Sequence, residues 1–183
     1  MSKHTQPGYT LVEMTVVLSI AGLVMAWVLG SVNRVIPSWN VERAAQDIAA
    51  SMRAARSKAM VEGVDATIPF DVAGRRYQVI TRSAPGASYF ETDFGGNLYA
   101  VNQLPDTVVF KQPSGNNNSV TCSPPASGGD KAVSFNAAGV LLSSSTPCYV
   151  YVANRSEGVY RRVRVTIVGT VAIQKWTGSR WES

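Results

Sequence analysis

The chain has 183 residues, of which 45% are hydrophobic and only 16% are charged, whereas about 25% of the residues of a typical soluble domain are charged. The formal net charge is +5, from 17 Lys and Arg against 12 Asp and Glu. One histidine (His4) and two cysteines (Cys122 and Cys148) exclude a His-rich metal site and an unaided zinc site, and they argue against Ser-His or Cys-His catalysis. We therefore expect no enzyme activity, no cofactor and no metal.

The first long apolar segment runs from Met14 to Val32 and contains no charged residue. About 20 apolar residues span the core of a bilayer as a helix, whereas helices of soluble proteins rarely stay uncharged for so long. The segment therefore predicts a membrane helix. A buried helix of a soluble protein and a secretory signal cleaved at Gly30-Ser31 are the alternatives.

Glu13 lies at the start of this apolar segment. A carboxylate within a membrane helix costs about 2.5–3.5 kcal/mol on insertion scales, so we interpret Glu13 as functional. Together with the short, weakly basic leader before it, the stretch from Gly8 to Glu13 resembles the type III signal of type IV pilins and type II secretion pseudopilins. The resemblance implies that a prepilin peptidase cuts after Gly8 and methylates Tyr9, which stands in place of the usual Phe or Met.

The same resemblance makes Glu13 the fifth residue of the mature chain and supplies its partner. After cleavage, the α-amino group of Tyr9 is a cation one helical turn from Glu13, so the carboxylate can pair with the amine of its own chain or of a neighbour. Such pairing offsets part of the desolvation cost of both charges and favours helices packed side by side. The alternative is an interfacial Glu13 that simply reaches water.

A second helical segment follows the apolar one. Pro37 predicts a kink or break just upstream, Asn40 is a candidate N-cap, and Gly63 is a candidate C-terminal stop. Apolar residues recur between them at spacings of three and four, which predicts one buried stripe. The stripe consists of Val41, Ala45, Ile48, Met52, Ala55 and Ala59.

Within this helix, the stretch from Ala55 to Met60 resembles the "ARSEA" sequence near the end of the first helix in the GspH/FimT family of minor pilins and minor pseudopilins. The stretch from Ser134 to Gly139 and the late strand pair around Gly169 also resemble that family. Short apolar strands separated by turns follow the helix, which argues for an α+β fold with a long N-terminal helix packed on a β-rich antiparallel head. The expected strands are Val64–Phe70, Arg76–Arg82, Thr107–Lys111, Ala132–Phe135, Cys148–Ala153, Arg161–Val168 and Val171–Trp176.

Cys122 and Cys148 flank a segment rich in Ser, Pro and Gly. The membrane-anchored stalk would place the head outside the cytoplasm, where disulfides form, so we expect a disulfide between them. In the chain-entropy model a loop of this length gains about 3–4 kcal/mol. The alternative, a reactive thiol pair, lacks an identifiable activating group.

A basic cluster, Arg161, Arg162 and Arg164, lies on one expected strand. Side chains alternate along a strand, so Arg162 and Arg164 share one face and Arg161 takes the other. The three are candidate nucleic-acid contacts, with Arg75, Arg76, Arg180 and the Trp residues in support. Some FimT-like minor pilins bind DNA during uptake and share a Gly-Arg-x-Arg sequence, but the matching stretch from Gly169 to Ala172 lacks both arginines. A solvated polar strand face is the preferred interpretation.

These observations together predict a minor pilin or pseudopilin that primes or caps a type IV pilus or a type II secretion pseudopilus. We expect a leader at residues 1–8, a transmembrane and assembly helix at 9–36, an amphipathic helix at 37–63 and a periplasmic head at 64–183. The expected location is the inner membrane, with a single pass, and then the filament tip. The expected partners are the prepilin peptidase, other minor and major pilins or pseudopilins, and the inner-membrane assembly platform. A DNA-binding minor pilin and a membrane-tethered enzyme are the alternative functions.

Overall fold

The computed structural model describes residues 10–81, 101–114, 119–122, 131–142, 147–156 and 158–183. For residues 28–35 it describes the backbone alone. The chain divides into two compact units, residues 1–36 and residues 37–183, and each is described by itself. Within the described residues, no helix contains a stretch that is both long and apolar enough to cross a membrane.

One helix, α1, runs from Leu11 to Glu62 and crosses the boundary between the two units. Gly63 ends it with a φ of 66°, a left-handed conformation that glycine adopts without strain, so the expected C-terminal stop is confirmed. The expected N-cap at Asn40 is wrong, because α1 begins further upstream. The helix also does not break at Pro37, since a proline removes only one backbone hydrogen bond and the flanking turns retain theirs.

Among the described residues of the second unit, two five-stranded antiparallel sheets follow α1. In the first sheet, β1 pairs with β6 along one side and with β2 and β3 along the other, and β2 pairs with β4. Its strands are β1 (Ala66–Asp71), β2 (Arg76–Tyr77), β3 (Ile80–Thr81), β4 (Asn102–Gln103) and β6 (Lys131–Phe135).

The second sheet has the order β10-β9-β8-β7-β5. Its register pairs Val150 with Val163, and Val163 with Ile173, so these apolar residues lie on one face. The strands are β5 (Val108–Val109), β7 (Cys148–Asn154), β8 (Tyr160–Val165), β9 (Val171–Trp176) and β10 (Trp181–Glu182).

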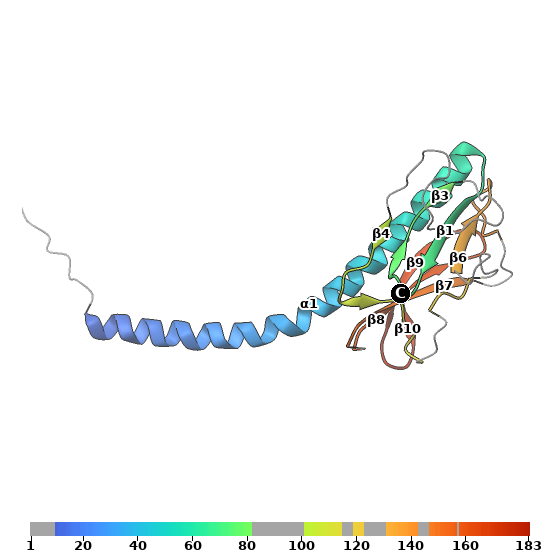
Figure 1. The fold of residues 1–183 in the computed structure, drawn as a ribbon. Coiled ribbons are helices and arrows are strands. Elements are labelled where there is room, and N and C mark those ends of the chain that lie inside the picture. The colour runs from blue at the N-terminus through green and yellow to red at the C-terminus, as the bar shows by residue number, and fades with distance from the viewer. Residues whose placement is uncertain (1–9, 82–100, 115–118, 123–130, 143–146, 157) are drawn as a thin grey trace, which may run out of the picture. The chain divides into compact units, whose positions relative to one another are not determined.

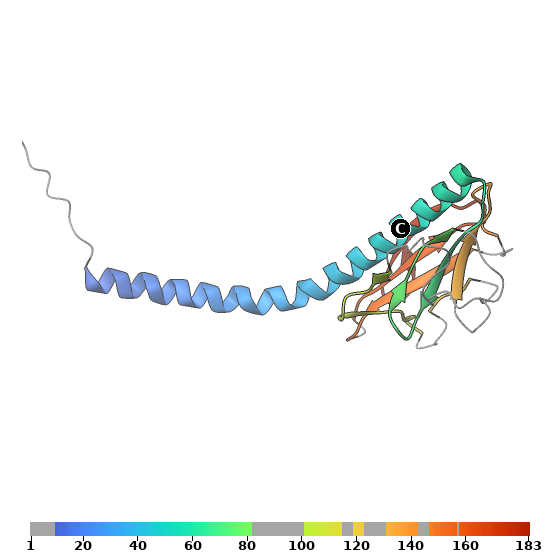
Figure 2. The same cartoon turned by 45° about the horizontal axis from the view of Figure 1, so that its top comes forward.

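The core lies between the second half of α1 and the two sheets. Figure 1 and Figure 2 show this half of the helix running along the strands. All six residues of the expected stripe are fully buried, and they form one cluster with Ile68, Phe70 and Phe135 of the first sheet and with Val150 and Val163 of the second. Four of the six are alanine or valine, whose small side chains allow a helix to approach a sheet closely. The predicted α+β fold is confirmed.

The strand predictions differ from the structure chiefly in two places. The strand expected over Arg76–Arg82 is divided into β2 and β3, although both keep one continuous register against β1. By that register the gap lies opposite Pro69, which has no N–H to donate. The strand expected over Arg161–Val168 ends at Val165, where a turn closed by the Gly169 N–H and the Thr166 carbonyl begins.

Candidate assembly site and surface arginines

Glu13 caps the beginning of α1. Its Oε2 atom accepts hydrogen bonds from the backbone N–H of Thr10 at 2.9 Å and from the Thr10 hydroxyl at 3.0 Å, and the Thr10 Oγ1 atom accepts the Glu13 N–H at 3.2 Å. This reciprocal arrangement is a capping box, which satisfies two of the backbone donors that a helix start leaves unpaired. Gly8 and Tyr9 lie outside the described residues, so the pairing of Glu13 with the Tyr9 amine stays a prediction.

The helix that follows Glu13 presents apolar side chains to its surroundings. Leu11 is 82% exposed, Leu23 is 75% exposed and Trp27 is 85% exposed. A soluble monomer rarely exposes contiguous apolar surface of this kind, which is typical of a segment that contacts lipid or other chains. The exposed carboxylate of Glu13 lies at the start of this surface.

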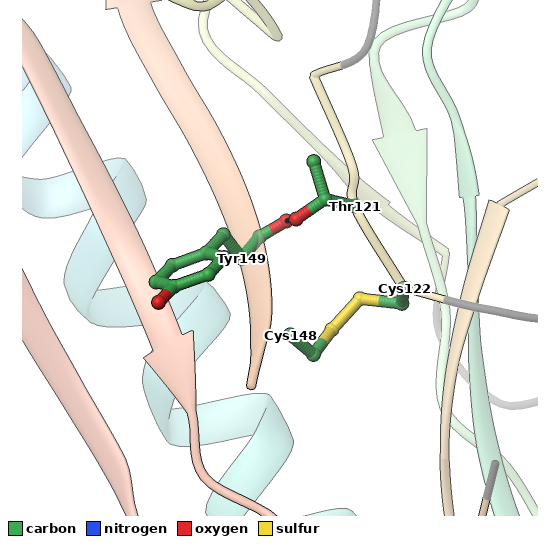
Figure 3. Close-up of a disulfide and its surroundings, with 4 residues drawn as sticks. All are labelled: Thr121, Cys122, Cys148 and Tyr149. Carbon is green, nitrogen blue, oxygen red and sulfur yellow. Dashed lines mark hydrogen bonds between the residues drawn. A yellow bond between two sulfur atoms is a disulfide. The ribbon is translucent and has the colours of Figure 1, made fainter. Parts of the chain in front are cut away.

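Cys122 and Cys148 form a disulfide, as expected; they lie 26 positions apart in the sequence and their Cα atoms are 4.8 Å apart. Cys148 is the first residue of β7 and is fully buried. The segment before Cys122 runs antiparallel to β7, with Val120 bridged to Val150 and the Thr121 N–H bonded to the Tyr149 carbonyl at 2.9 Å. Figure 3 shows the disulfide beside Thr121 and Tyr149, where the Thr121 hydroxyl also donates to the Tyr149 carbonyl at 3.4 Å. The covalent link therefore fastens two segments that the backbone already pairs.

The three arginines of β8 separate onto two faces, as the alternation predicts. The Nε atom of Arg161 lies 2.6 Å from Oε2 of Glu42 on α1, and only 12% of the Arg161 side chain is exposed. A partly buried ion pair of this kind links the sheet to the helix and leaves Arg161 poorly placed to contact another molecule.

Arg162 lies on the opposite face of the second sheet, between two aromatic rings. Its guanidinium carbon is 4.5 Å from the centre of the Tyr149 ring and 4.6 Å from the centre of the Trp181 ring. Its Nε atom donates to Oε1 of Gln174 at 2.7 Å. Arg164 shares this face, and its Nε atom is buried without a hydrogen-bond partner.

The other basic residues considered for DNA contact are paired with carboxylates. Arg75 Nη2 lies 2.8 Å from Asp106 Oδ1, and the guanidinium of Arg75 lowers the pKa of Asp106. Arg76 bonds Asp71 and Arg180 bonds Glu182, each at 2.7 Å. With Arg161 held by Glu42, four of these six arginines have an acidic partner within the chain.

Polar contacts fasten the second half of α1 to the head. Asn40 Nδ2 donates to Thr107 Oγ1 at 3.1 Å, near the start of the buried stripe. Near the other end, Arg53 donates to the Val171 carbonyl at 3.3 Å and Arg56 donates to the Gly139 carbonyl at 2.9 Å. Together with the Glu42–Arg161 pair, these contacts fix the helix at both ends of the stripe.

Gly139 and Gly169 allow this close approach at the end of α1. Their φ angles are 73° and 80°, which favour glycine. A Cβ atom at Gly139 would lie 2.7 Å from Met60 Sδ, and one at Gly169 would lie 2.6 Å from Arg56 Nε. Among the described residues, no group of three or more His, Cys, Asp or Glu side chains is placed to hold a metal ion.

Residues 44–169 match the family described as type II transport protein GspH. The chain belongs to the GspH family. Residues 3–29 match the prokaryotic N-terminal methylation motif, a range that includes Gly8, Tyr9 and Glu13. The family is one of minor pseudopilins and minor pilins, so the suspected resemblance is confirmed. No curated protein has significant sequence similarity to the chain.

Two solved structures share the fold of this GspH-family chain. The minor pseudopilin EpsH from the type 2 secretion system of Vibrio cholerae is 15% identical, with a TM-score of 0.52 over 73% of this chain and 95% of that chain. The type IV minor pilin FimU of Pseudomonas aeruginosa is 17% identical, with a TM-score of 0.50 over 78% of this chain and 92% of that chain. At these identities the likeness concerns the fold.

The two stretches that carry the resemblance to the GspH family meet in space. Arg56 belongs to the helix stretch and Gly139 ends the turn stretch, and the two are hydrogen-bonded. Thr10 was not expected as a partner of Glu13, although Thr10-x-x-Glu13 has the spacing of a capping box. The pairing of Glu42 with Arg161 was not expected either, because the two residues lie 119 positions apart in the sequence.

Proposed function

We propose that this GspH-family chain is a minor pilin or minor pseudopilin that enters a type IV pilus or a type II secretion pseudopilus. A prepilin peptidase removes residues 1–8, and residues 9–36 form the transmembrane and assembly helix. Residues 37–63 continue as the amphipathic helix, and residues 64–183 form the periplasmic head. The processed chain waits in the inner membrane until the assembly platform draws it into a filament.

One observation carries this proposal: an apolar, exposed helix surface begins with a single carboxylate held at the helix start. Glu13 is the one charged residue between Tyr9 and Val32 in the sequence, and the large apolar side chains that follow it are exposed. Lipid covers such a surface before assembly, and the helices of neighbouring subunits cover it afterwards.

Glu13 has two alternative partners, Thr10 in the capping box of its own chain and the amine of Tyr9 in a neighbouring subunit. In the single chain its carboxylate accepts hydrogen bonds from Thr10. In a filament the methylated amine of a neighbouring Tyr9 is the stronger partner, because an unpaired cation in an apolar medium is costly and a nearby carboxylate offsets part of that cost.

As a minor subunit, the chain acts at or near the end of the filament, where it primes or caps assembly. The apolar helix provides the packing shared with other subunits. The head is fastened to its own helix by the buried stripe and by the Glu42–Arg161 and Arg56–Gly139 contacts, so it is carried into the filament as one body with residues 37–63.

Deletion and fractionation in the organism that encodes the chain test this proposal. Loss of the chain should reduce either the number of surface pili or the amount of secreted protein, and the affected process identifies the machine. The processed chain should be recovered with sheared pili or with pseudopilins cross-linked in the membrane. Normal piliation and normal secretion without the chain, combined with its absence from both fractions, would contradict the proposal.

A further inference from the structure

The face of the second sheet that points away from α1 carries an unusual combination of side chains. Along β8 the residues on this face alternate with the buried Val163 and Val165, and the strand register places their partners in β7 and β9 on the same face. We call it the arginine–aromatic face, and define it by Tyr149, Tyr151, Arg162, Arg164, Trp176 and Trp181.

The aromatic rings hold Arg162 in a fixed position. Its guanidinium is stacked between Tyr149 and Trp181, and Trp181 in turn packs on Trp176 with the ring centres 5.1 Å apart. The Nε atom is engaged by Gln174. A guanidinium held in this way has its two outer N–H groups directed along its plane, which is the geometry that binds a carboxylate with two parallel hydrogen bonds.

Arg164 adds a second cation on the same face, two residues along β8. Its Nε atom is buried without a hydrogen-bond partner, and leaving such a donor unpaired is unfavourable. Within the part of the chain that the structure describes, no ion pair involves Arg162 or Arg164, whereas Arg161 on the other face is paired with Glu42. The face therefore carries two positive charges without a compensating acid among the described residues.

We propose that the arginine–aromatic face is a docking surface for an acidic polypeptide segment of a partner protein. Carboxylates of that segment bind the in-plane N–H groups of Arg162 and Arg164, and the half-buried side chains of Tyr149, Trp176 and Trp181 contact its apolar atoms. An acidic peptide fits better than a single-stranded nucleic acid, because a base requires a free ring face and Arg162 occupies a face of both Tyr149 and Trp181. The inference goes beyond the proposed function and holds for either filament.

Binding of a labelled hexaglutamate peptide to the full chain in non-ionic detergent tests this surface. Fluorescence anisotropy should show binding that weakens as salt is added, while hexaglutamine should not bind. Arg164→Gln should weaken binding about tenfold or more, since it removes the fork that holds a carboxylate. Lys175→Gln is the matched control, because Lys175 is exposed on the opposite face of β9 and the change removes the same charge.

Arg162→Gln disturbs the aromatic stack as well as the charge, so Arg164→Lys serves as the second variant. It keeps the charge but not the fork, and it should bind hexaglutamate more weakly than the original chain and more tightly than Arg164→Gln. Unchanged unfolding temperatures of both Arg164 variants confirm that the head is intact. The proposal is overturned if hexaglutamate does not bind, if Arg164→Gln and Lys175→Gln bind it equally, or if oligothymidylate of equal charge binds more tightly than hexaglutamate.

Discussion

The Nε atom of Arg56 donates a 2.9 Å hydrogen bond to the carbonyl oxygen of Gly139, 83 residues further along the chain. The contact joins the last turns of α1 to the turn after β6. It is possible only because no side chain projects from Gly139, where a Cβ atom would lie 2.7 Å from Met60 Sδ and 2.9 Å from Met60 Cγ. The end of the helix and the head are therefore matched in shape as well as in polarity.

Gly139→Ala should destabilise the head. The new methyl group meets Met60, and the φ of 73° is unfavourable for alanine, so we expect a loss of about 1–3 kcal/mol in the free energy of unfolding. Denaturant unfolding of the full chain in detergent measures this. Gly158→Ala is the control, because a Cβ atom there has no neighbour within 4 Å, and it should change stability by less than about 1 kcal/mol in either direction. Equal effects of the two substitutions would contradict the account.

Asp71 should make the first sheet sensitive to acid. Burial acts to raise the pKa of Asp71, but hydrogen bonds from the Gly74 N–H and from Arg76, both 2.7 Å, outweigh it and hold the pKa below its usual value. A lowered folded-state pKa stabilises the fold above the unfolded pKa of about 3.9, and that contribution is lost as the pH falls through the folded-state value.

The test compares Asp71→Asn with Asp65→Asn, in which an exposed carboxylate undergoes the same change of charge. At neutral pH, Asp71→Asn should lower the free energy of unfolding by about 1–2 kcal/mol. The loss should shrink as the pH falls below about 4. If both variants show the same dependence of stability on pH, the ionised Asp71 does not stabilise the β1–β2 pair.

The Cys122–Cys148 disulfide should stabilise the second unit through the loop that it closes. Closing a loop of this length contributes about 3–4 kcal/mol in the chain-entropy model, so Cys122→Ala/Cys148→Ala should lower the denaturation midpoint clearly. Peptide mapping without reductant should recover one linked peptide pair from membrane-extracted protein. Two thiols that alkylate freely in such material would show that the bond is absent in the cell.

Sequence periodicity was sufficient for the parts of the fold that depend on local pattern. The buried stripe from Val41 to Ala59, the stop at Gly63 and the separation of Arg161 from Arg162 all follow from spacings of three to four or of two residues. The start of α1 was misjudged, because Asn40 has the chemistry of an N-cap but its side chain bonds Thr107 instead.

Tertiary contacts account for what the sequence did not reveal. The gap between β2 and β3 lies opposite Pro69 in the neighbouring strand, and the two residues of β10 pair with the last two residues of β9. The role of Arg161 depends on Glu42, which no local pattern connects to it. The capping box of Thr10 and Glu13 is the exception, since its spacing was visible in the sequence.

The mature chain should begin at Tyr9. Mass spectrometry of the N-terminal peptide from membrane-extracted protein should find a methylated Tyr9 and no residue of the leader. Gly8→Val should block the cut, because a larger residue replaces the small one at the cleavage point, and the chain should then keep its leader. An intact Met1 in the unaltered chain, or a start near Val32, would contradict the type III signal.

Glu13 offers the most direct test of the central claim, because its two partners can be separated by substitution. Glu13→Gln removes the charge but can keep the capping hydrogen bonds, since glutamine also serves at this position of a capping box. Thr10→Ala removes the cap, at about 0.5–2 kcal/mol, but keeps the carboxylate. Both variants should be processed and should remain in the membrane.

The decisive measurement is the amount of each variant recovered in sheared filaments or cross-linked pseudopilus complexes, relative to the amount in the membrane. If Glu13 meets the amine of a neighbouring Tyr9, the Glu13→Gln variant should be nearly absent from the assembled fraction, because an uncompensated buried cation costs about 3–5 kcal/mol. The Thr10→Ala variant should be incorporated almost normally. Normal incorporation of Glu13→Gln, or failure of Thr10→Ala alone, would show that Glu13 serves only as a helix cap and does not direct assembly.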